Sequence, residues 1–207
     1  MKIILMMMVS ALTLFGCQSE VVDDYKSSVV KVQLTGGHGS GVYIGNNLIL
    51  TAAHVISGAT DGKVKIKTES GNVLDGEVLW FNLARDLGVV RVIDTEGLRE
   101  AYLSCVIPKM DTEIYARGNP GITEFFTAWG RVSDLVPHTI GPWLNAMTID
   151  ASISGGMSGG PVFNLNGQVV GISVGIMGTH IDNSSSLSGV GIMVPGSVAC
   201  SLLGRTA

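Results

Sequence analysis

Three separate segments of the chain carry the side chains that acyl transfer needs. His54 ends a TAAH motif at 51–54, Asp86 lies in the ARDLGVV segment at 84–90, and Ser158 lies in the glycine-dense GGMSGGP segment at 155–161. A serine hydroxyl is a weak nucleophile unless a base takes its proton and a third group orients that base. Histidine, aspartate and serine in this chain order supply those roles. The pattern therefore predicts a nucleophilic serine site assembled from distant segments.

The glycines around Ser158 have a chemical reason of their own. A turn that directs two backbone N–H groups at one point needs unusual backbone angles, which glycine adopts without a Cβ clash. We therefore expect the N–H groups of Gly156 and Ser158 to form an oxyanion hole, which stabilises the charge that develops on a carbonyl oxygen.

The elements that must position these residues are short strands. Apolar or alternating runs of a few residues recur along the chain, separated by turn signals rich in glycine and asparagine. Residues 63–67 alternate strictly between charged and apolar side chains, as in a half-buried strand. This pattern predicts an all-β sandwich or pair of barrels. Residues 195–203 can form a short terminal helix that begins at a proline, residues 98–107 connect two halves, and the serine run 184–186 is typical of a loop.

Composition excludes several classes of function. Only 14% of the 207 residues are charged and the net charge is −4, so a basic surface for nucleic acid is not expected. There are 28 glycines, which argues against a long helical protein. The three cysteines form no CxxC pair or Cys/His cluster, so no metal site is predicted.

The first residues are typical of a secretion signal. A single lysine precedes a short apolar run that is too short to span a bilayer comfortably. The segment 14–17 (LFGC) resembles a bacterial lipobox, in which Cys17 becomes the lipidated first residue; an ordinary secretion signal is the alternative. We therefore expect a signal peptide at 1–16 and a tether at 17–26. In such a compartment Cys105 and Cys200 can form a disulfide or remain two buried thiols.

The motifs together resemble the trypsin-like serine proteases, and most closely the HtrA/Deg branch. The resemblance covers residues 28–205 and rests on the three segments above together with GSGV at 39–42, GNPG at 118–121 and NLNGQVVGI at 164–172. It implies an all-β fold of two six-stranded antiparallel β-barrels with a short C-terminal helix. The protease domain would occupy 27–207, with barrels at 27–104 and 108–194 and the helix at 195–205.

The resemblance also implies roles for the residues. Ser158 would attack the peptide carbonyl, His54 would act as general base and then acid, and Asp86 would orient the imidazole; no metal or organic cofactor is implied. The expected protein is a serine endopeptidase in a bacterial cell envelope, lipid-anchored through Cys17 and facing the periplasm or the exterior. Gln18 after Cys17 favours the outer membrane. The alternative is a catalytically silent homologue that binds extended peptides as a chaperone-like module.

Several positions depart from relatives of known specificity. Met157 stands where digestive proteases carry an aspartate, and a thioether cannot form the ion pair made there. Ser152 stands where trypsin-type relatives carry an aspartate. Ser173 stands where glutamate-specific relatives carry a histidine. We therefore expect Ile153, Ser173 and Gly175 to line a small apolar pocket, for cleavage after small or aliphatic residues. Val174 and its neighbours 175–176 would form the edge strand that binds substrate. The PDZ domain common in this branch, and partners bound through it, are not expected.

Overall fold

Short strands make up most of the chain, as the sequence predicts. The computed structural model describes residues 26–181 and 184–206. In chain order the elements are β1 (Val29–Leu34), β2 (Gly37–Tyr43), β3 (Leu48–Thr51), α1 (Ala53–Ile56), β4 (Lys63–Thr68), β5 (Val73–Asn82), β6 (Leu87–Val92), β7 (Glu113–Gly118), β8 (Phe126–Val132), β9 (His138–Ile140), β10 (Trp143–Ala151), β11 (Pro161–Asn164), β12 (Val169–Ile181), β13 (Ser184–Pro195) and α2 (Gly196–Leu202).

The first six strands close into a barrel. Their order is β1-β2-β3-β6-β5-β4, and antiparallel pairing of β1 with β4 completes the ring. Strand β4 explains the pattern in its sequence, because Val64 and Ile66 are buried while Lys63 and Lys65 are exposed. These alternate side chains fill the barrel interior together with residues such as Val90.

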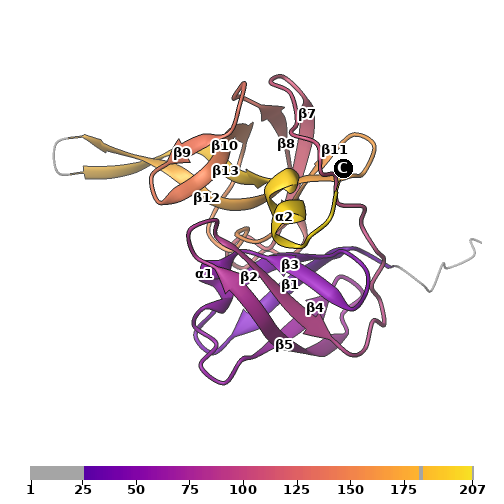
Figure 1. Cartoon of the computed structure of the whole chain (residues 1–207). Helices are drawn as coiled ribbons and strands as arrows, with labels where there is room; N and C mark the ends of the chain where they lie inside the picture. Colours follow the sequence, from indigo (N-terminus) through magenta and orange to yellow (C-terminus); the bar gives the residue numbers. More distant parts are fainter. Residues whose placement is uncertain (1–25, 182–183, 207) are drawn as a thin grey trace, which may run out of the picture.

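The second barrel is built from β7, β8, β10, β11, β12 and β13. Its strand order is β13-β12-β11-β7-β8-β10, and pairing between β10 and β13 closes it. Strand β9 adds a seventh strand on the outer edge of β10. The β12–β13 hairpin extends well beyond the barrel, on the left of Figure 1.

A continuous apolar cluster joins the two barrels, which lie one above the other in Figure 1. Leu50 and Leu87 from the first barrel belong to the same buried cluster as Phe163, Ile172 and Val174 from the second. Burial of each large apolar side chain contributes roughly 1.5–3 kcal/mol. The relative position of the barrels is therefore set by core packing.

A disulfide ties the C-terminal helix to the connector between the barrels. Cys105 and Cys200 are bonded, with their Cα atoms 5.6 Å apart. Of the two alternatives open at the sequence level, the disulfide is the one that the structure contains. Disulfides persist in oxidising compartments outside the cytoplasm. Within the described part of the chain, no helix is long and apolar enough to cross a membrane.

The predicted fold class is confirmed, with three corrections of detail. The serine run 184–186 is not a loop but the start of β13, because it pairs with residues 179–181 of β12 across the hairpin. The terminal helix ends at Leu202, and a second helix, α1, carries His54. The predicted signal peptide, Cys17 and tether residues 17–25 lie outside the described residues.

Candidate active site

His54 and Asp86 form a hydrogen-bonded pair at the top of the first barrel. The His54 Nδ1 atom lies 2.7 Å from Asp86 Oδ2, and the backbone N–H of His54 donates to Asp86 Oδ1 at 2.9 Å. The carboxylate accepts, so Nδ1 carries the proton and Nε2 of a neutral ring is left as an acceptor. The His54 side chain is 46% exposed, whereas the Asp86 side chain is 6% exposed. A buried carboxylate thus holds an accessible imidazole.

The turn before β6 gives Asp86 its orientation. Its backbone adopts a φ of 49°, in the left-handed region that aspartate tolerates better than most residues. Its N–H donates to the carbonyl of Leu83 at 3.2 Å, which closes the turn. The carboxylate is thereby directed at His54 in α1.

The pKa of Asp86 is lower than that of an ordinary aspartate. Burial alone raises the pKa, but hydrogen bonds from the side chain and backbone of His54 and from Trp143 oppose this effect, and together they lower the pKa of the carboxyl group. Asp86 therefore remains ionised at neutral pH.

Trp143 is a site residue that no sequence motif indicates. Its indole Nε1–H donates to Asp86 Oδ2 at 2.9 Å, although Trp143 belongs to β10 of the second barrel. A tryptophan in a strand is usually a core residue, so no local signal distinguishes it. The contact depends on the packing of the two barrels.

Ser158 lies in a loop that is fixed to both barrels. Its carbonyl accepts a hydrogen bond from the N–H of Ser40 in β2, and the next residue, Gly159, donates its N–H to Ser173 in β12. A Cβ on Gly159 would lie 2.2 Å from Thr51 Oγ1, so this loop packs directly against the segment before His54. Within the described residues, no hydrogen bond joins the Ser158 hydroxyl to the imidazole of His54.

The peptide group before Gly156 has a fixed orientation. The carbonyl of Gly155 accepts a hydrogen bond from Gly121 N–H at 3.0 Å. In a trans peptide the N–H of Gly156 points in the opposite direction. Gly156 has a φ of +97°, and a Cβ there would lie 2.3 Å from the carbonyl oxygen of Asn119. Neither Gly156 N–H nor Ser158 N–H donates to an acceptor among the residues that the structure describes.

The GSGV segment at 39–42 and the GNPG segment at 118–121 hold the loop 155–158 through hydrogen bonds. The Ser40 hydroxyl donates to the carbonyl of Gly156 at 2.8 Å and accepts the N–H of Asn119 at 2.9 Å. The carbonyl of Asn119 accepts a hydrogen bond from His38 Nε2 at 2.9 Å. The GSGV and GNPG segments are thus brought together beside residues 155–158.

Met157 packs where digestive relatives place an ion pair. Its side chain is fully buried in the core of the second barrel, among residues that include Met147, Ile149 and Ile153. The loop that bears Ser158 is therefore anchored by apolar packing, which a thioether side chain provides well.

The predicted substrate-binding residues lie together along β12 and the loop before Ser158, but they present different groups. Ser173 and Val174 are each 1% exposed, and Val174 belongs to the cluster between the barrels. Their side chains are therefore not available to a ligand, and the backbone of Ser173 is hydrogen-bonded to Gly159 and Gly160. Ile153 is 6% exposed and contacts the backbone of β13, since a Cβ on Gly191 would lie 2.5 Å from Ile153 Cγ1. Gly175 is partly exposed at the edge of β12.

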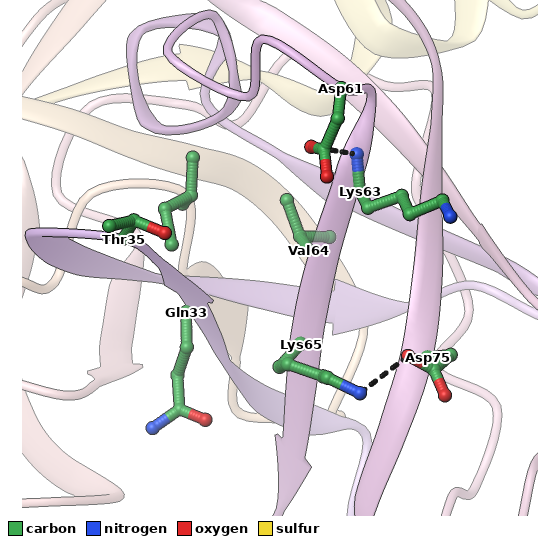
Figure 2. Close-up of a pocket in the computed structure, with 8 residues that line it drawn as sticks. Gln33, Thr35, Asp61, Lys63, Val64, Lys65 and Asp75 are labelled. Atoms are coloured by element: carbon green, nitrogen blue, oxygen red, sulfur yellow. Dashed lines mark hydrogen bonds and ion pairs between the residues drawn. The ribbon is translucent and has the colours of Figure 1, made fainter.

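A surface pocket on the first barrel lies apart from His54, Asp86 and Ser158 and is lined by charged side chains. Figure 2 shows it between β1 and β4, where Lys65 pairs with Asp75 at 2.6 Å and Lys63 N–H donates to Asp61. None of the three motif residues lines it. The described part of the chain contains no group of three or more His, Cys, Asp or Glu side chains that could hold a metal ion.

The chain is similar to serine proteases of known sequence. Residues 39–172 match the model of the trypsin-like peptidase domain. The chain is 33% identical over 172 residues to the putative serine protease HhoA of Synechocystis, and 30% identical over 168 residues to a glutamyl endopeptidase of Staphylococcus epidermidis. These matches cover 77% and 72% of this chain, and 40% and 58% of the respective relatives. A probable periplasmic serine protease of Haemophilus influenzae is 29% identical over 174 residues, which are 81% of this chain and 36% of that protein.

A solved structure supports the same fold. The Rv3671c protease in its inactive form superposes with a TM-score of 0.70, covering 91% of this chain and 93% of that one. The sequence identity is 23%, so this likeness concerns the fold alone.

The lowered pKa of Asp86 predicts how acid affects stability. A group whose pKa is lower in the folded state contributes stability above its unfolded pKa, near 4, and that contribution is lost as the pH falls through the folded value. We expect the wild-type protein to be more stable than Asp86→Asn at neutral pH. The difference should shrink as the pH falls below about 4.

Urea unfolding followed by circular dichroism between neutral pH and pH 2 measures this difference. Asp150→Asn, which changes an exposed carboxylate, is the matched control and should show little pH-dependent difference. A constant gap between wild type and Asp86→Asn at all pH values would contradict the assignment.

Proposed function

Because the chain belongs to the trypsin-like peptidase family, as a serine protease of the HtrA type, we propose that it is an endopeptidase that uses Ser158, His54 and Asp86 as a catalytic triad. The observation that carries the proposal is the pairing of the buried Asp86 carboxylate with the Nδ1 atom of His54. This pairing leaves Nε2 as a base, and the loop that bears Ser158 packs against the same segment.

In the first half of the reaction, His54 Nε2 takes the proton of the Ser158 hydroxyl as the oxygen attacks the peptide carbonyl. The N–H groups of Gly156 and Ser158, which lack acceptors among the described residues, would then bind the oxyanion. Each such donor typically contributes about 3–4 kcal/mol to transition-state stabilisation. His54 next gives the proton to the departing amine, and the acyl chain stays on Ser158.

In the second half, water replaces the amine. His54 takes a proton from the water as its oxygen attacks the acyl carbonyl, and the proton then returns to Ser158 Oγ as the product acid leaves. Asp86 remains ionised throughout and stabilises the imidazolium that forms twice. Its lowered pKa is consistent with that role.

The substrate is proposed to bind as an added strand. Gly175 and Ile176 of β12 pair with β13 on one side, whereas on the other side the backbone hydrogen bonds of β12 end at Ser173, which bonds Gly159 and Gly160. The other edge therefore offers backbone groups to an extended peptide. The side chain before the scissile bond would meet Ile153, which contacts Gly191 of β13 and leaves little depth. Small or aliphatic side chains fit this arrangement.

We place the enzyme outside the cytoplasm, on a lipid anchor at Cys17. The Cys105–Cys200 disulfide supports an oxidising compartment, and a relative is described as a probable periplasmic protease. The anchor itself rests on the sequence of residues 14–17. The outer membrane is preferred because Gln18 follows the cysteine.

The triad is tested by Ser158→Ala. Wild-type protein should cleave unfolded casein and react with a fluorophosphonate probe, and removal of the nucleophile should lower kcat by roughly 10⁶-fold and abolish labelling. Ser133→Ala, which changes an exposed serine of the same barrel, should behave as wild type. Equal cleavage by wild type and Ser158→Ala would refute the enzyme proposal. No cleavage by either would refute it as well and would support the chaperone-like alternative.

The pocket is tested by Ile153→Ala. With peptides that differ only at the residue before the cut, wild type should prefer alanine or valine. The variant should shift the ratio of kcat/KM toward leucine or phenylalanine by roughly 10–200-fold, as expected for a pocket enlarged by a few methylenes. Ile153→Val, which leaves a smaller cavity, should shift it less.

Ile93→Ala changes an 89% exposed isoleucine of the first barrel and serves as the control. A wild-type preference for glutamate would contradict the pocket assignment, as would an unchanged profile in folded Ile153→Ala.

The anchor is tested by metabolic labelling with a fatty acid. Wild-type protein expressed in a bacterial host should incorporate the label and sediment with membranes, because an acylated cysteine binds the bilayer. Cys17→Ala should do neither. Labelling that survives in this variant would exclude Cys17 as the anchor.

A further inference from the structure

The indole of Trp143 lies between the Asp86 carboxylate and the edge of β12. Its Nε1–H donates to Asp86 Oδ2 at 2.9 Å, the same oxygen that accepts His54 Nδ1 at 2.7 Å. Asp86 therefore receives three hydrogen bonds, two from His54 in the first barrel and one from β10 in the second.

The six-membered ring of the same indole lies against Gly175. A Cβ on Gly175 would lie 2.6 Å from Trp143 Cη2 and 2.7 Å from Cζ2. The six-membered ring is thus packed against the backbone of β12, at the place where substrate is proposed to add. Any side chain at position 175 would have to displace this ring.

The start of β10 is itself fixed to the turn that carries Asp86. The N–H of Leu144, the residue after Trp143, donates to the carbonyl of Ala84 at 3.2 Å. Trp143 also packs against the apolar cluster between the barrels. Its position relative to Asp86 is therefore set by one backbone hydrogen bond, one side-chain hydrogen bond and core packing.

We propose that Trp143 is a positioning residue for the triad, and that it links occupancy of the β12 edge at Gly175 to the orientation of Asp86. This inference rests on the proposed function. An indole N–H donates and cannot accept, so it satisfies an ionised carboxylate and restricts its rotation. A peptide strand added beside Gly175 would hold the ring in place and keep Asp86 aligned with His54.

Trp143→Phe removes the donor and keeps an aromatic ring. A hydrogen bond to a charged group is lost, so we expect kcat to fall by at least about tenfold while KM changes little. Trp143→Ala removes the ring as well and should also raise KM, because the β12 edge loses its support. Trp129→Phe, at a 67% exposed tryptophan of β8, is the control and should match wild type.

A double-mutant cycle tests the link to β12. Gly175→Ala should lower kcat in the wild-type background, because the new methyl group would displace the indole. In the Trp143→Ala background the same substitution should have much less effect on kcat, since no ring remains to be displaced. Additive effects of the two substitutions would overturn the link.

A spectroscopic measurement separates this proposal from the proposed function. In the Ser158→Ala protein, the low-field proton resonance of His54 Nδ1–H reports the bond to Asp86 without any need for activity. Trp143→Phe should move that resonance to lower field, because Oδ2 is no longer shared with the indole. A protein that shows this shift but has no wild-type activity would refute the proposed function alone. An unchanged resonance, or unchanged kcat in an active enzyme, would overturn the role of Trp143.

Discussion

The burial of the Asp86 charge is the constraint on which the rest of the site depends. A carboxylate that is only 6% exposed is costly unless its oxygens are hydrogen-bonded. Its donors come from α1 and from the first residue of β10. The turn before β6, the helix after β3 and the β9–β10 hairpin must therefore all be in place together. The hydrogen bond from the His54 ring that stabilises the buried carboxylate also fixes the orientation of that ring.

Both barrels contribute residues to the site, so the site depends on how the barrels are held together. Apolar packing and polar contacts make different contributions to this arrangement. The shared cluster around Leu50, Leu87 and Phe163 sets the distance between the barrels. Directional contacts then fix the orientation of one barrel relative to the other. The N–H of Ser40 donates to the carbonyl of Ser158, and the Glu124 carboxylate forms ion pairs with Lys31 and Lys67 of the first barrel. Apolar packing is not directional, whereas hydrogen bonds lose strength quickly when misaligned.

Much of this architecture could be predicted from the sequence, because it is encoded locally. Alternation in segments such as 63–67 predicts strands, and the motifs around His54, Asp86 and Ser158 predict the pairing that the structure contains between the first two. What local patterns could not supply depends on tertiary packing. The indole of Trp143 reaches Asp86 from the other barrel, and Ser173 and Val174 turn their side chains into the interior. The serine run 184–186, polar enough to be typical of a loop, is a strand because its partner in the hairpin supplies the pairing.

The glycines explain how the loop that bears Ser158 is anchored with a methionine, and no ion pair, at position 157. Gly156 and Gly159 have φ values of +97° and +86°, and side chains there would overlap the backbone of the first barrel or of residue 119. Close approach lets the loop use backbone hydrogen bonds to Ser40, Gly121 and Ser173. Met157 then needs only to fill the core below, which it does completely. Because these anchors involve backbone groups and apolar packing, the loop conformation does not depend on the ionisation of a side chain at position 157. The polar side chains of the site remain available for chemistry.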